Sequence, residues 1–416
     1  VSGVVLGANT QATGYLFAEV PQARVGIAKQ VVGSTTTNAD GSFNVVFRLV
    51  VRNHSLEALS AVNVTDALAG AAPRFGTYNA GTLADGQYKM AAAPSGSCGG
   101  LQAGFTGSGA GQTVAVIPSL TAGMSCSIDF ALQVRPTAPL PPLLASGGRY
   151  ENQAVVEAAG ALSGQTPATN PQLRDLSDNG ANPDANGNGR SNEAGENDPT
   201  PVAPGFAAAI GIAKQLNGGV AAQGDGSLVV PLRLVVANVG DEPLHGVSIT
   251  APLSAAAGGP FGGGVAGGAA AVLASGQYTV QTAPAFSGAC ANGAAAPGYT
   301  GDSGNVAVAT ISAMPTSAFC TIDFAFRFMP AVATAYVNQA QASGTGDYTN
   351  APVVDLSDHG TVPDPNGNGN AGEAGENDPT PVSFAQAALS AVNGTVYLDA
   401  NHNRVDDDAP APASVQ

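Results

Sequence analysis

Tryptophan is absent from this 416-residue chain, and charged side chains make up only 11% of it. Lysine and arginine together number 14. The formal net charge is −16, and no basic stripe is present that could displace counterions from nucleic acid, so nucleic-acid binding is not expected. The lack of tryptophan also leaves no aromatic platform for binding sugars.

Long apolar runs are missing as well. No run reaches the roughly 18 residues that a transmembrane helix requires, and no basic segment followed by an apolar core marks a signal peptide. The chain begins with Val1 instead of Met. We therefore expect a mature protein or a piece of a longer one, with any export signal already removed.

Cysteine is scarce, but its four copies form two pairs with similar spacing and surroundings, "SGSC…MSCSIDF" and "SGAC…AFCTIDF". No CxxC or histidine-rich spacing suggests zinc. The sequence therefore predicts the disulfides Cys98–Cys126 and Cys290–Cys320, and with them an oxidising compartment.

The chain is a unit of about 185 residues written twice. "VGIAKQVVG" at 25–33 returns as "IGIAKQLNG" at 210–218, and "DGSFNVVFRLVVRN" at 40–53 returns as "DGSLVVPLRLVVAN" at 225–238. Within each copy, short runs of alternating apolar residues are separated by Gly, Pro, Asn and Asp. This pattern predicts an all-β fold of two tandem antiparallel β-sandwiches with almost no helix.

Acidic residues are concentrated in a few places. Sixteen of the 30 lie in the segments 175–198, 355–378 and 399–408. In the first segment, Asp184, Asn186 and Asn188 alternate before Gly189, as calcium-binding oxygens do in a tight loop. The acids that follow are spaced differently from those of an EF-hand. We expect calcium here, in preference to magnesium, although a disordered acidic linker would have a similar composition.

The predicted calcium ligands fall into three sets. They are Asp178, Asp184, Asn186, Asn188, Glu193, Glu196 and Asp198 in the first acidic segment; Asp358, Asp364, Asn366, Asn368, Glu373, Glu376 and Asp378 in the second; and Asp399, Asn401, Asn403 and Asp407 in the third.

Lysine occurs three times, and Lys29 and Lys214 hold the same repeat position on the apolar side of a first strand. Asn152 and Asn338 recur near the last strand, in "YENQA" and "YVNQA". Since first and last strands of such sandwiches often lie side by side, each pair could condense to an intramolecular isopeptide bond. The reaction needs a nearby protonated acid.

Asp129 and Asp323 are the matched candidates for that acid, although their strand parity opposes the apolar face. The alternative is a lysine that extends to solvent and an asparagine that satisfies a turn.

Two stretches resemble known extracellular modules. "IAKQ…DGSFNVVFRLVVRNHSLEALSAVNVTD", followed by "NQA" and "DLSDNG…PDANGNG…GENDPTPV", resembles the repeats called domain of unknown function 11. The resemblance implies immunoglobulin-like sandwiches on a secreted or surface-anchored bacterial protein. The second copy departs from the pattern at "SITAPL" (248–253), where the family's Asp after Thr is absent, which counts against a role for Asp66. "NGTVYLDANHNRVDDDAPAP" resembles the start of a B-type repeat of serine-aspartate surface proteins, with Arg404 where Gly is usual.

The predicted organisation follows from these features. It comprises an N-terminal strand segment (1–20), a sandwich (21–172), an acidic calcium-loop linker (173–202), a second sandwich (203–353), a second acidic calcium-loop linker (354–382), and a C-terminal strand with a third loop (383–416). The end segments carry the strand-like stretches "VVL", "YLF" and "NGTVYLD", which could complete a neighbour's sheet or belong to truncated modules.

The predicted function is structural. We expect a calcium-rigidified extracellular protein that polymerises with itself, head to tail through its terminal strands, into a fibre, sheath or surface layer. The alternative is the stalk or ligand-binding module of a monomeric adhesin, contacting a cell-envelope or host ligand through its Gly/Ala-rich insertions. No nucleophile, base and acid recur as a constellation, so we do not expect an enzyme.

Overall fold

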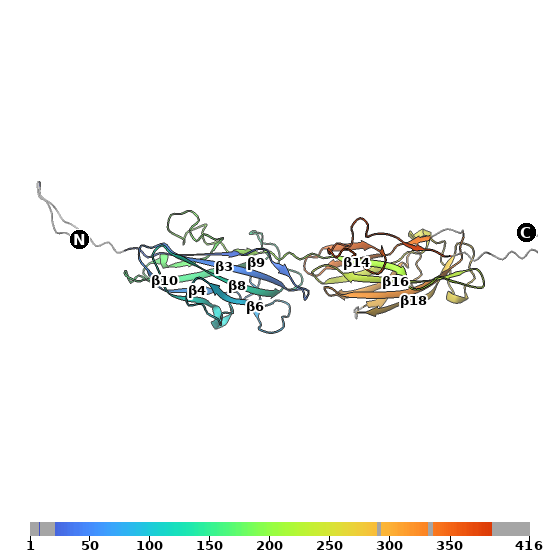
Figure 1. Cartoon of the computed structure of the whole chain (residues 1–416), viewed down its shortest axis with the longest axis horizontal. Coiled ribbons are helices and arrows are strands. Elements are labelled where there is room, and N and C mark those ends of the chain that lie inside the picture. Colours follow the sequence, from blue (N-terminus) through green and yellow to red (C-terminus); the bar gives the residue numbers. More distant parts are fainter. Residues whose placement is uncertain (1–7, 9–20, 289–292, 332–335, 385–416) are drawn as a thin grey trace, which may run out of the picture.

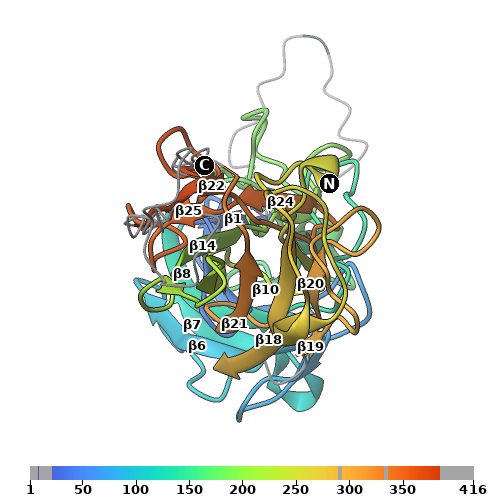
Figure 2. The same cartoon turned by 90° about the vertical axis from the view of Figure 1, so that its right-hand side faces the viewer.

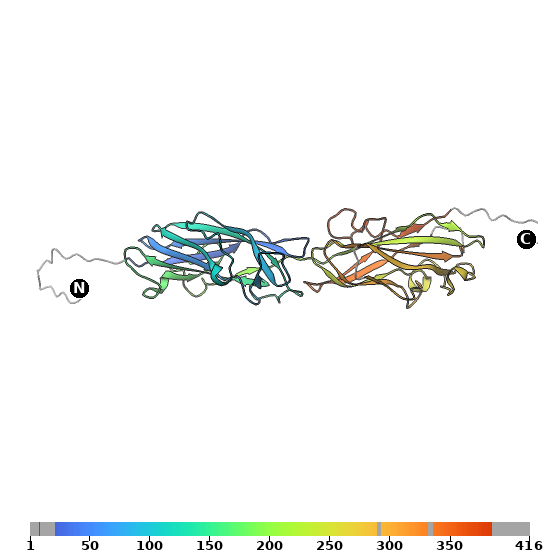
Figure 3. The ribbon, with the colours of Figure 1, turned by 90° about the horizontal axis from the view of Figure 1, so that it is seen from below.

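The computed structural model describes residue 8 and residues 21–288, 293–331 and 336–384. Two elongated β-sandwiches lie end to end, which we call unit 1 (21–202) and unit 2 (203–384) (Figures 1 and 3). Viewed along the long axis, unit 2 lies in front of unit 1 (Figure 2). The predicted all-β tandem fold is confirmed. In the described part of the chain, the only helices are the short 3-10 turns η1 (Gly109–Gln112), η2 (Pro171–Leu173), η3 (Ala255–Ala257) and η4 (Gly268–Ala270), and none is long and apolar enough to span a bilayer.

Unit 1 is built from two main sheets and a small ribbon. The first sheet has the order β12 (Asp178–Asn179), β1 (Val25–Val31), β3 (Phe43–Asn53), β8 (Ser125–Arg135), β6 (Gln87–Gly96) and β5 (Thr77–Tyr78), with β2 (Thr36–Thr37) paired to β3. The second has the order β11 (Arg174–Leu176), β10 (Ala154–Gly160), β4 (Leu59–Asp66) and β7 (Thr113–Leu120), and β13 (Thr200–Val202) pairs with β9 (Tyr150–Asn152).

Unit 2 repeats this plan. Its first sheet has the order β18 (Tyr278–Gly288), β21 (Phe319–Phe328), β16 (Leu228–Asn238), β14 (Ile210–Leu216) and β25 (Asp358–His359), with β15 (Ala221–Ala222) paired to β16. Its second sheet has the order β19 (Gly293–Ala295), β20 (Ala307–Met314), β17 (Leu244–Thr250), β23 (Gln341–Gly346) and β24 (Pro352–Leu356), and β22 (Tyr336–Asn338) pairs with β26 (Thr380–Val382).

The core of each unit follows from the predicted alternation. Along β3, Phe43, Val45, Phe47, Leu49 and Val51 are buried, and the residues between them face outward to varying degrees. Side chains that alternate along a strand lie on opposite faces of the sheet, so this face packs against the second sheet. The register repeats as well, since Lys29 is opposite Leu49 in unit 1 and Lys214 is opposite Leu234 in unit 2.

The sequence suggested that the acidic segments are linkers between the sandwiches, and this prediction is wrong. Segment 173–202 packs along unit 1: β11 pairs with β10, β12 pairs in parallel with β1, and β13 pairs with β9. Segment 354–382 does the same in unit 2, through β24, β25 and β26. Main-chain hydrogen bonds to edge strands hold these segments, which composition alone does not reveal. Only residues 203–209 connect β13 to β14.

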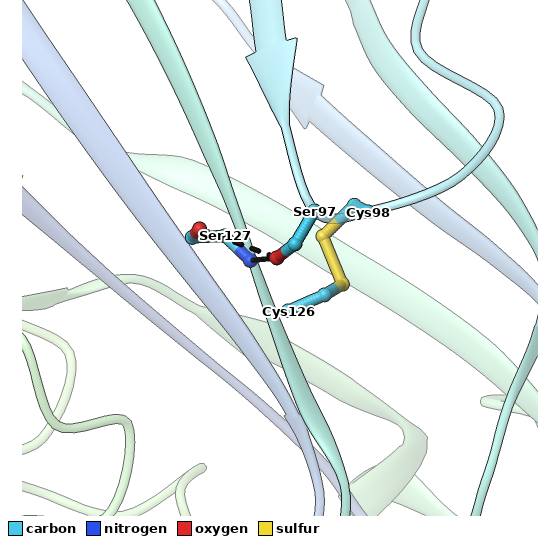
Figure 4. The surroundings of a disulfide bond; sticks show 4 residues. All are labelled: Ser97, Cys98, Cys126 and Ser127. Carbon is cyan, nitrogen blue, oxygen red and sulfur yellow. Dashed lines mark hydrogen bonds between the residues drawn. A yellow bond between two sulfur atoms is a disulfide. The ribbon is translucent and has the colours of Figure 1, made fainter.

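One of the two predicted disulfides is described. Cys98 and Cys126 are bonded across the end of β6 and the start of β8, next to a hydrogen bond from Ser127 N to Ser97 Oγ of 2.9 Å (Figure 4). Cys320 is disulfide-bonded, and Cys290, its predicted partner, lies outside the described residues. So do the third predicted calcium loop (Asp399, Asn401, Asn403 and Asp407) and nearly all of the two terminal strand segments.

The joint between the units centres on an aromatic residue of the connection. Phe206 is 8% exposed, with its ring centre 6.1 Å from that of Phe43 in unit 1 and 4.7 Å from that of Tyr348 in unit 2. Thr37 Oγ1 donates to Asp241 Oδ2 at 2.9 Å beside it. The connection is therefore part of the core of unit 1, and Tyr348 of unit 2 packs onto that core as well.

We predict that Phe206→Ala loosens this joint. Truncating a buried phenylalanine typically costs about 3–5 kcal/mol of unfolding free energy. Thermal unfolding should shift downward, and small-angle scattering should show a broader range of overall lengths. Phe319→Ala is the control, since Phe319 is 56% exposed, and its effect should stay within about 0.5 kcal/mol. Equal effects of the two substitutions would contradict this description of the joint.

Candidate functional site: a buried lysine and an acidic segment in each unit

Lys29 lies in the middle of β1 and is completely buried. Its Nζ is 4.2 Å from the ring centre of Phe47 and 5.4 Å from that of Phe130. Burial lowers the pKa of Lys29, and the opposing attraction of Asp66 does not overcome it. A lysine amine in such a position has a greater tendency to be neutral and nucleophilic than one in water.

Two side chains from other strands contact this amine. Lys29 Nζ donates to Asn152 Oδ1, from β9, and lies 2.5 Å from Asp66 Oδ2, at the end of β4. Asn152 Nδ2 donates to the carbonyl of Ala67 at 3.2 Å, which orients the amide. The other carboxyl oxygen of Asp66 is buried and has no hydrogen-bond partner. An amine, a carboxamide and a carboxyl group therefore meet in the core.

This arrangement contains the groups that amide formation needs. The amine is the nucleophile, the carboxamide carbon of Asn152 is the electrophile, and the Asp66 carboxyl is placed to move a proton between them. Lys29 on β1 and Asn152 on β9 come into contact although the two strands do not pair with each other. Each pairs instead with a strand of the acidic segment, β1 with β12 and β9 with β13.

The acids suggested by the sequence lie elsewhere. Asp129 accepts two hydrogen bonds from Arg48, each of 2.7 Å, on the outer face of the sheet, and Asp323 is bound in the same way by Arg233. Because residues alternate between the two faces of a strand, Asp129 and Asp323 point away from the core. They are therefore not the acids of the lysine sites. The acid beside Lys29 is Asp66. Comparison of the two repeats had argued against a role for this residue, because the second copy lacks it.

Unit 2 has the lysine and the asparagine but not the acid. Lys214 is completely buried and donates to Asn338 Oδ1. Asn338 Nδ2 donates to the carbonyl of Pro252 at 2.7 Å, matching the contact of Asn152 in unit 1. Ala251 stands at the position of Asp66. Burial lowers the pKa of Lys214 to about 7.

The predicted calcium loop of unit 1 closes on itself. Asp184 accepts hydrogen bonds from the backbone of Asn188 (3.1 Å) and Gly189 (2.9 Å). Asn188 Nδ2 donates to Glu193 at 2.8 Å, and the backbone of Asn186 donates to Glu196 at 2.9 Å. Five of the predicted ligands therefore lie around one turn.

The same turn forms in unit 2. Asp364 accepts from the backbone of Gly367 (2.9 Å) and Gly369 (2.8 Å). Asn366 Nδ2 donates to Glu373 at 3.2 Å, and the backbone of Asn370 donates to Asn368 Oδ1 at 2.8 Å.

A second group of carboxylates lies under each loop, against the first strand. Asp178 has its pKa raised to about 6 by burial and by the nearby charges of Glu196 and Asp198. Asp175 accepts a hydrogen bond of 2.8 Å from Ile27 N, and burial raises its pKa to about 8. In unit 2, Asp355 accepts from Ile212 N at 2.7 Å, and burial raises its pKa to about 7, with Asp358 and Glu376 adding to the shift.

These carboxylates leave buried oxygens unsatisfied. Glu196 is 3% exposed and Glu376 is 6% exposed, and one oxygen of each has no hydrogen-bond partner. An unpaired buried carboxylate oxygen is unfavourable unless a cation or a proton satisfies it. The described residues hold no three acidic, cysteine or histidine side chains already arranged around one metal position. A calcium ion would therefore use amide and backbone oxygens in addition to the carboxylates, as its preference for six to eight oxygens permits.

A glycine on each first strand lets the acidic segment approach. A Cβ on Gly26 would lie 2.2 Å from Ser191 Oγ and 2.9 Å from His54 Nε2, and one on Gly211 would lie 2.9 Å from Pro363 Cβ. His54 Nδ1 is 3.7 Å from Asp184 Oδ2. Ser191 Oγ and His54 Nε2 have no hydrogen-bond partners, so these three side chains pack the loop and do not form a nucleophile–base pair.

The sequence matches no protein-family model and no curated protein. The resemblance to domain of unknown function 11 thus has no family match behind it. Similar solved structures include the full-length major pilin SpaD of Corynebacterium diphtheriae, at 9% identity and TM-score 0.27 over 81% of this chain and 66% of that one. Another is a variant of the major pilin subunit of Bacillus cereus, at 10% identity and TM-score 0.26 over 65% of this chain and 63% of that one.

A variant of the enterotoxigenic E. coli adhesin CfaE matches at 8% identity and TM-score 0.24, covering 88% of both chains. The chain spans less than two thirds of either of the two pilins named above. With scores this low, the likenesses support no inference about function, and the fold rests on the strand pairings.

We predict that Asp175 makes stability depend on pH. Because its folded pKa is raised, the folded state holds a proton that the unfolded state has released, and the unfolding free energy falls as pH rises from about 4 towards 8. Asp175→Asn should remove this part of the slope in thermal unfolding between pH 5 and 9 in calcium-free buffer. The control is Asp129→Asn, whose carboxyl has a lowered pKa because of Arg48, so its slope should match the wild type. An unchanged slope for Asp175→Asn would contradict the prediction.

Proposed function

We propose that the chain is a structural, load-bearing protein of the bacterial exterior in which unit 1 seals itself with an amide bond between Lys29 and Asn152. The observation that carries this proposal is the buried contact of the Lys29 amine with Asn152 and Asp66. Polar groups of this kind are rarely buried without a role, since each costs free energy to remove from water.

The proposed reaction is a balanced amide exchange. Neutral Lys29 Nζ attacks Asn152 Cγ, and the new N–C bond forms as the bond from Cγ to Nδ2 breaks. Asp66 takes the proton from Nζ and delivers it to the leaving nitrogen, so ammonia departs and Asp66 returns to its initial state. No oxidant, metal or cofactor is required.

A bond at this position suits a protein under tension. Lys29 is on the first strand and Asn152 is near the last, so a covalent link between them would join the two ends of the sandwich core. The 123 residues of sequence separation between them could not then be pulled out by force. The Cys98–Cys126 disulfide is consistent with the extracellular location that this role requires.

We propose that calcium binds the acidic segments. In unit 1, Asp184, Asn186, Asn188 and Glu193 would supply ligands from the turn, with Glu196 adding the buried oxygen that lacks a partner. Asp178 would contribute together with Asp198, since the charges of Glu196 and Asp198 both act on the Asp178 carboxyl. The bound ion would offset the repulsion among these carboxylates and fix the segment on its sandwich.

Polymerisation remains part of the proposal on sequence grounds. The segments 1–20 and 383–416 carry strand-like stretches that could add to a neighbour's sheet and generate a head-to-tail fibre, sheath or surface layer. The end-to-end placement of the two units is compatible with such an arrangement (Figure 3).

The alternative role, a ligand-binding module of an adhesin, is favoured by one feature of unit 2. A hollow of about 590 Å³ is lined by residues 264–268 of a Gly/Ala-rich insertion, with Tyr278, Tyr299 and Asp302. If the protein is an adhesin stalk or binding module, it should remain monomeric and bind a surface ligand at this hollow. Negative-stain images of native material would separate the two roles.

We predict that the reduced, denatured chain is lighter than its sequence mass by one ammonia molecule for the bond in unit 1. Asp66→Ala should retain the full mass by removing the proton carrier, and Lys29→Arg should do so by removing the nucleophile. Asp129→Asn is the matched control and should still lose ammonia. Mass spectrometry of protease fragments should find the peptides of Lys29 and Asn152 joined. A wild-type chain of full mass would contradict the amide.

We predict that calcium stabilises each acidic segment on its unit. A ligand at 100 times its dissociation constant adds about 2.7 kcal/mol to the unfolding free energy. Titration calorimetry of the full chain should show one fewer calcium site in Asp184→Ala and in Asp364→Ala than in the wild type. Asp129→Asn should keep every site, and magnesium should bind more weakly. Unchanged calcium binding in both loop variants would overturn the assignment.

A further inference from the structure

We propose that the chain combines one sealed and one unsealed sandwich: Lys214 and Asn338 of unit 2 are held in contact but stay unlinked, because Ala251 takes the place of the required acid. This inference rests on the proposed amide in unit 1. It extends that proposal by assigning opposite covalent states to two sites that share the same lysine–asparagine contact.

The two sites hold the lysine and the asparagine in the same way. Both lysines are completely buried and both donate to the asparagine side chain. Each lysine carbonyl accepts a 2.9 Å hydrogen bond from the hydroxyl of Thr200 or Thr380 in its acidic segment. A difference in reactivity would therefore come from the remaining neighbours, and not from how the lysine is held.

Those neighbours differ at three positions. Where unit 1 has Asp66 and Phe105, unit 2 has Ala251 and Tyr299. Leu232 also stands where Phe47 lies against the lysine of unit 1. The Tyr299 ring lies 5.4 Å from that of Phe324, as Phe105 lies 5.1 Å from Phe130. The hydroxyl of Tyr299 donates to the backbone carbonyl of Ala251 at 2.6 Å. Unit 2 thus has the Tyr299 hydroxyl next to the position where the carboxyl is missing. That hydroxyl already donates its proton to the backbone.

No described carboxylate pairs with Lys214, whereas Lys29 has Asp66 at 2.5 Å. A neutral amine beside an amide does not exchange readily on its own, because the nitrogen that leaves must gain a proton and the attacking nitrogen must lose one. General acid–base catalysis typically contributes a factor of about 10²–10⁴ to a rate. Without it, unit 2 keeps a free amine and a free carboxamide.

The consequence is mechanical asymmetry. Under tension, unit 1 would resist extension between Lys29 and Asn152. Unit 2 could unfold between Lys214 and Asn338, which are 124 residues apart, except for the loop that the disulfide of Cys320 closes. Each released residue adds roughly 3.3–3.6 Å of length. The chain would then contain a stretch of unit 1 that cannot extend, from Lys29 to Asn152, in series with a unit 2 that yields and refolds.

The test exchanges the differing pair between the units of the full chain. The double substitution Ala251→Asp with Tyr299→Phe gives unit 2 the acid and the neighbouring ring of unit 1, and Asp66→Ala with Phe105→Tyr does the reverse. Phe47 and Leu232 are left unchanged. Intact mass is measured after reduction and denaturation, with fragment mapping around all four lysine and asparagine positions. The wild type should lose one ammonia, the first variant two, and the second none. Lys214→Arg added to the first variant is the control and should return the loss to one.

Each outcome separates the two proposals. Loss of two ammonia molecules from the wild type, or a mapped Lys214–Asn338 link, would overturn the unsealed unit while leaving the amide of unit 1 intact. No loss from the wild type would overturn the amide of unit 1 and this inference with it. A folded first variant that loses only one ammonia would show that the missing acid is not what keeps unit 2 open. Circular dichroism checks folding, and if that variant does not fold, the wild-type fragment map alone decides whether unit 2 is linked.

Discussion

The burial of a lysine amine on the first strand is the constraint on which the rest of each unit depends. Lys29 and Lys214 have no exposed surface, and an amine in the core is unfavourable unless polar groups reach it. In unit 1 those groups come from β4 and β9, while the acidic segment covers the outer edge of β1. Gly180 N and Thr200 Oγ1 bind the backbone carbonyl of Lys29 at 2.8 and 2.9 Å. Strands β4 and β9 and the acidic segment thus enclose this one residue of β1.

The sequence predicted the fold and the lysine–asparagine contact wherever a residue pattern occurs in both repeats or alternates regularly along a strand. Alternating apolar residues identified the strands, the repeated blocks identified two units, and the recurrence of Lys29 and Asn152 at Lys214 and Asn338 pointed to their contact. Searching for residues that occur in both repeats did not identify the acid. Asp66 has no counterpart in unit 2, so comparison of the repeats removed the residue that distinguishes the two sites.

Recurrence also pointed to the wrong carboxylates. Asp129 and Asp323 recur because each pairs with an arginine on the adjacent strand, Arg48 or Arg233. A cross-strand ion pair on an exposed face is retained in both units for reasons that have nothing to do with the core. The alternation of the strand already contained this information, since odd and even positions of β8 lie on opposite faces.

The acidic segments show what composition cannot resolve. Asparagine, glycine and aspartate suit a flexible linker, a calcium loop and an edge-bound segment equally well. The deciding features are tertiary: the backbone pairing of Ala28 with Asp178 and the hydrogen bond from Ile27 N to Asp175. A two-residue strand such as β12 has no hydrophobic pattern of its own, so its place is determined by the edge of β1 that it covers.

The buried lysine and the buried carboxylates respond to different conditions. An amide between Lys29 and Asn152, once formed, would be indifferent to pH and to dissolved ions. The packing of Asp175, Asp178 and Glu196 depends on whether protons or a cation offset their mutual repulsion. Unit 1 would therefore keep its core closed even where its acidic segment is loosened. Unit 2 has a matching acidic segment but lacks an acid beside its lysine. Its resistance to opening would therefore depend on the non-covalent contacts of that segment and on the proposed calcium ion.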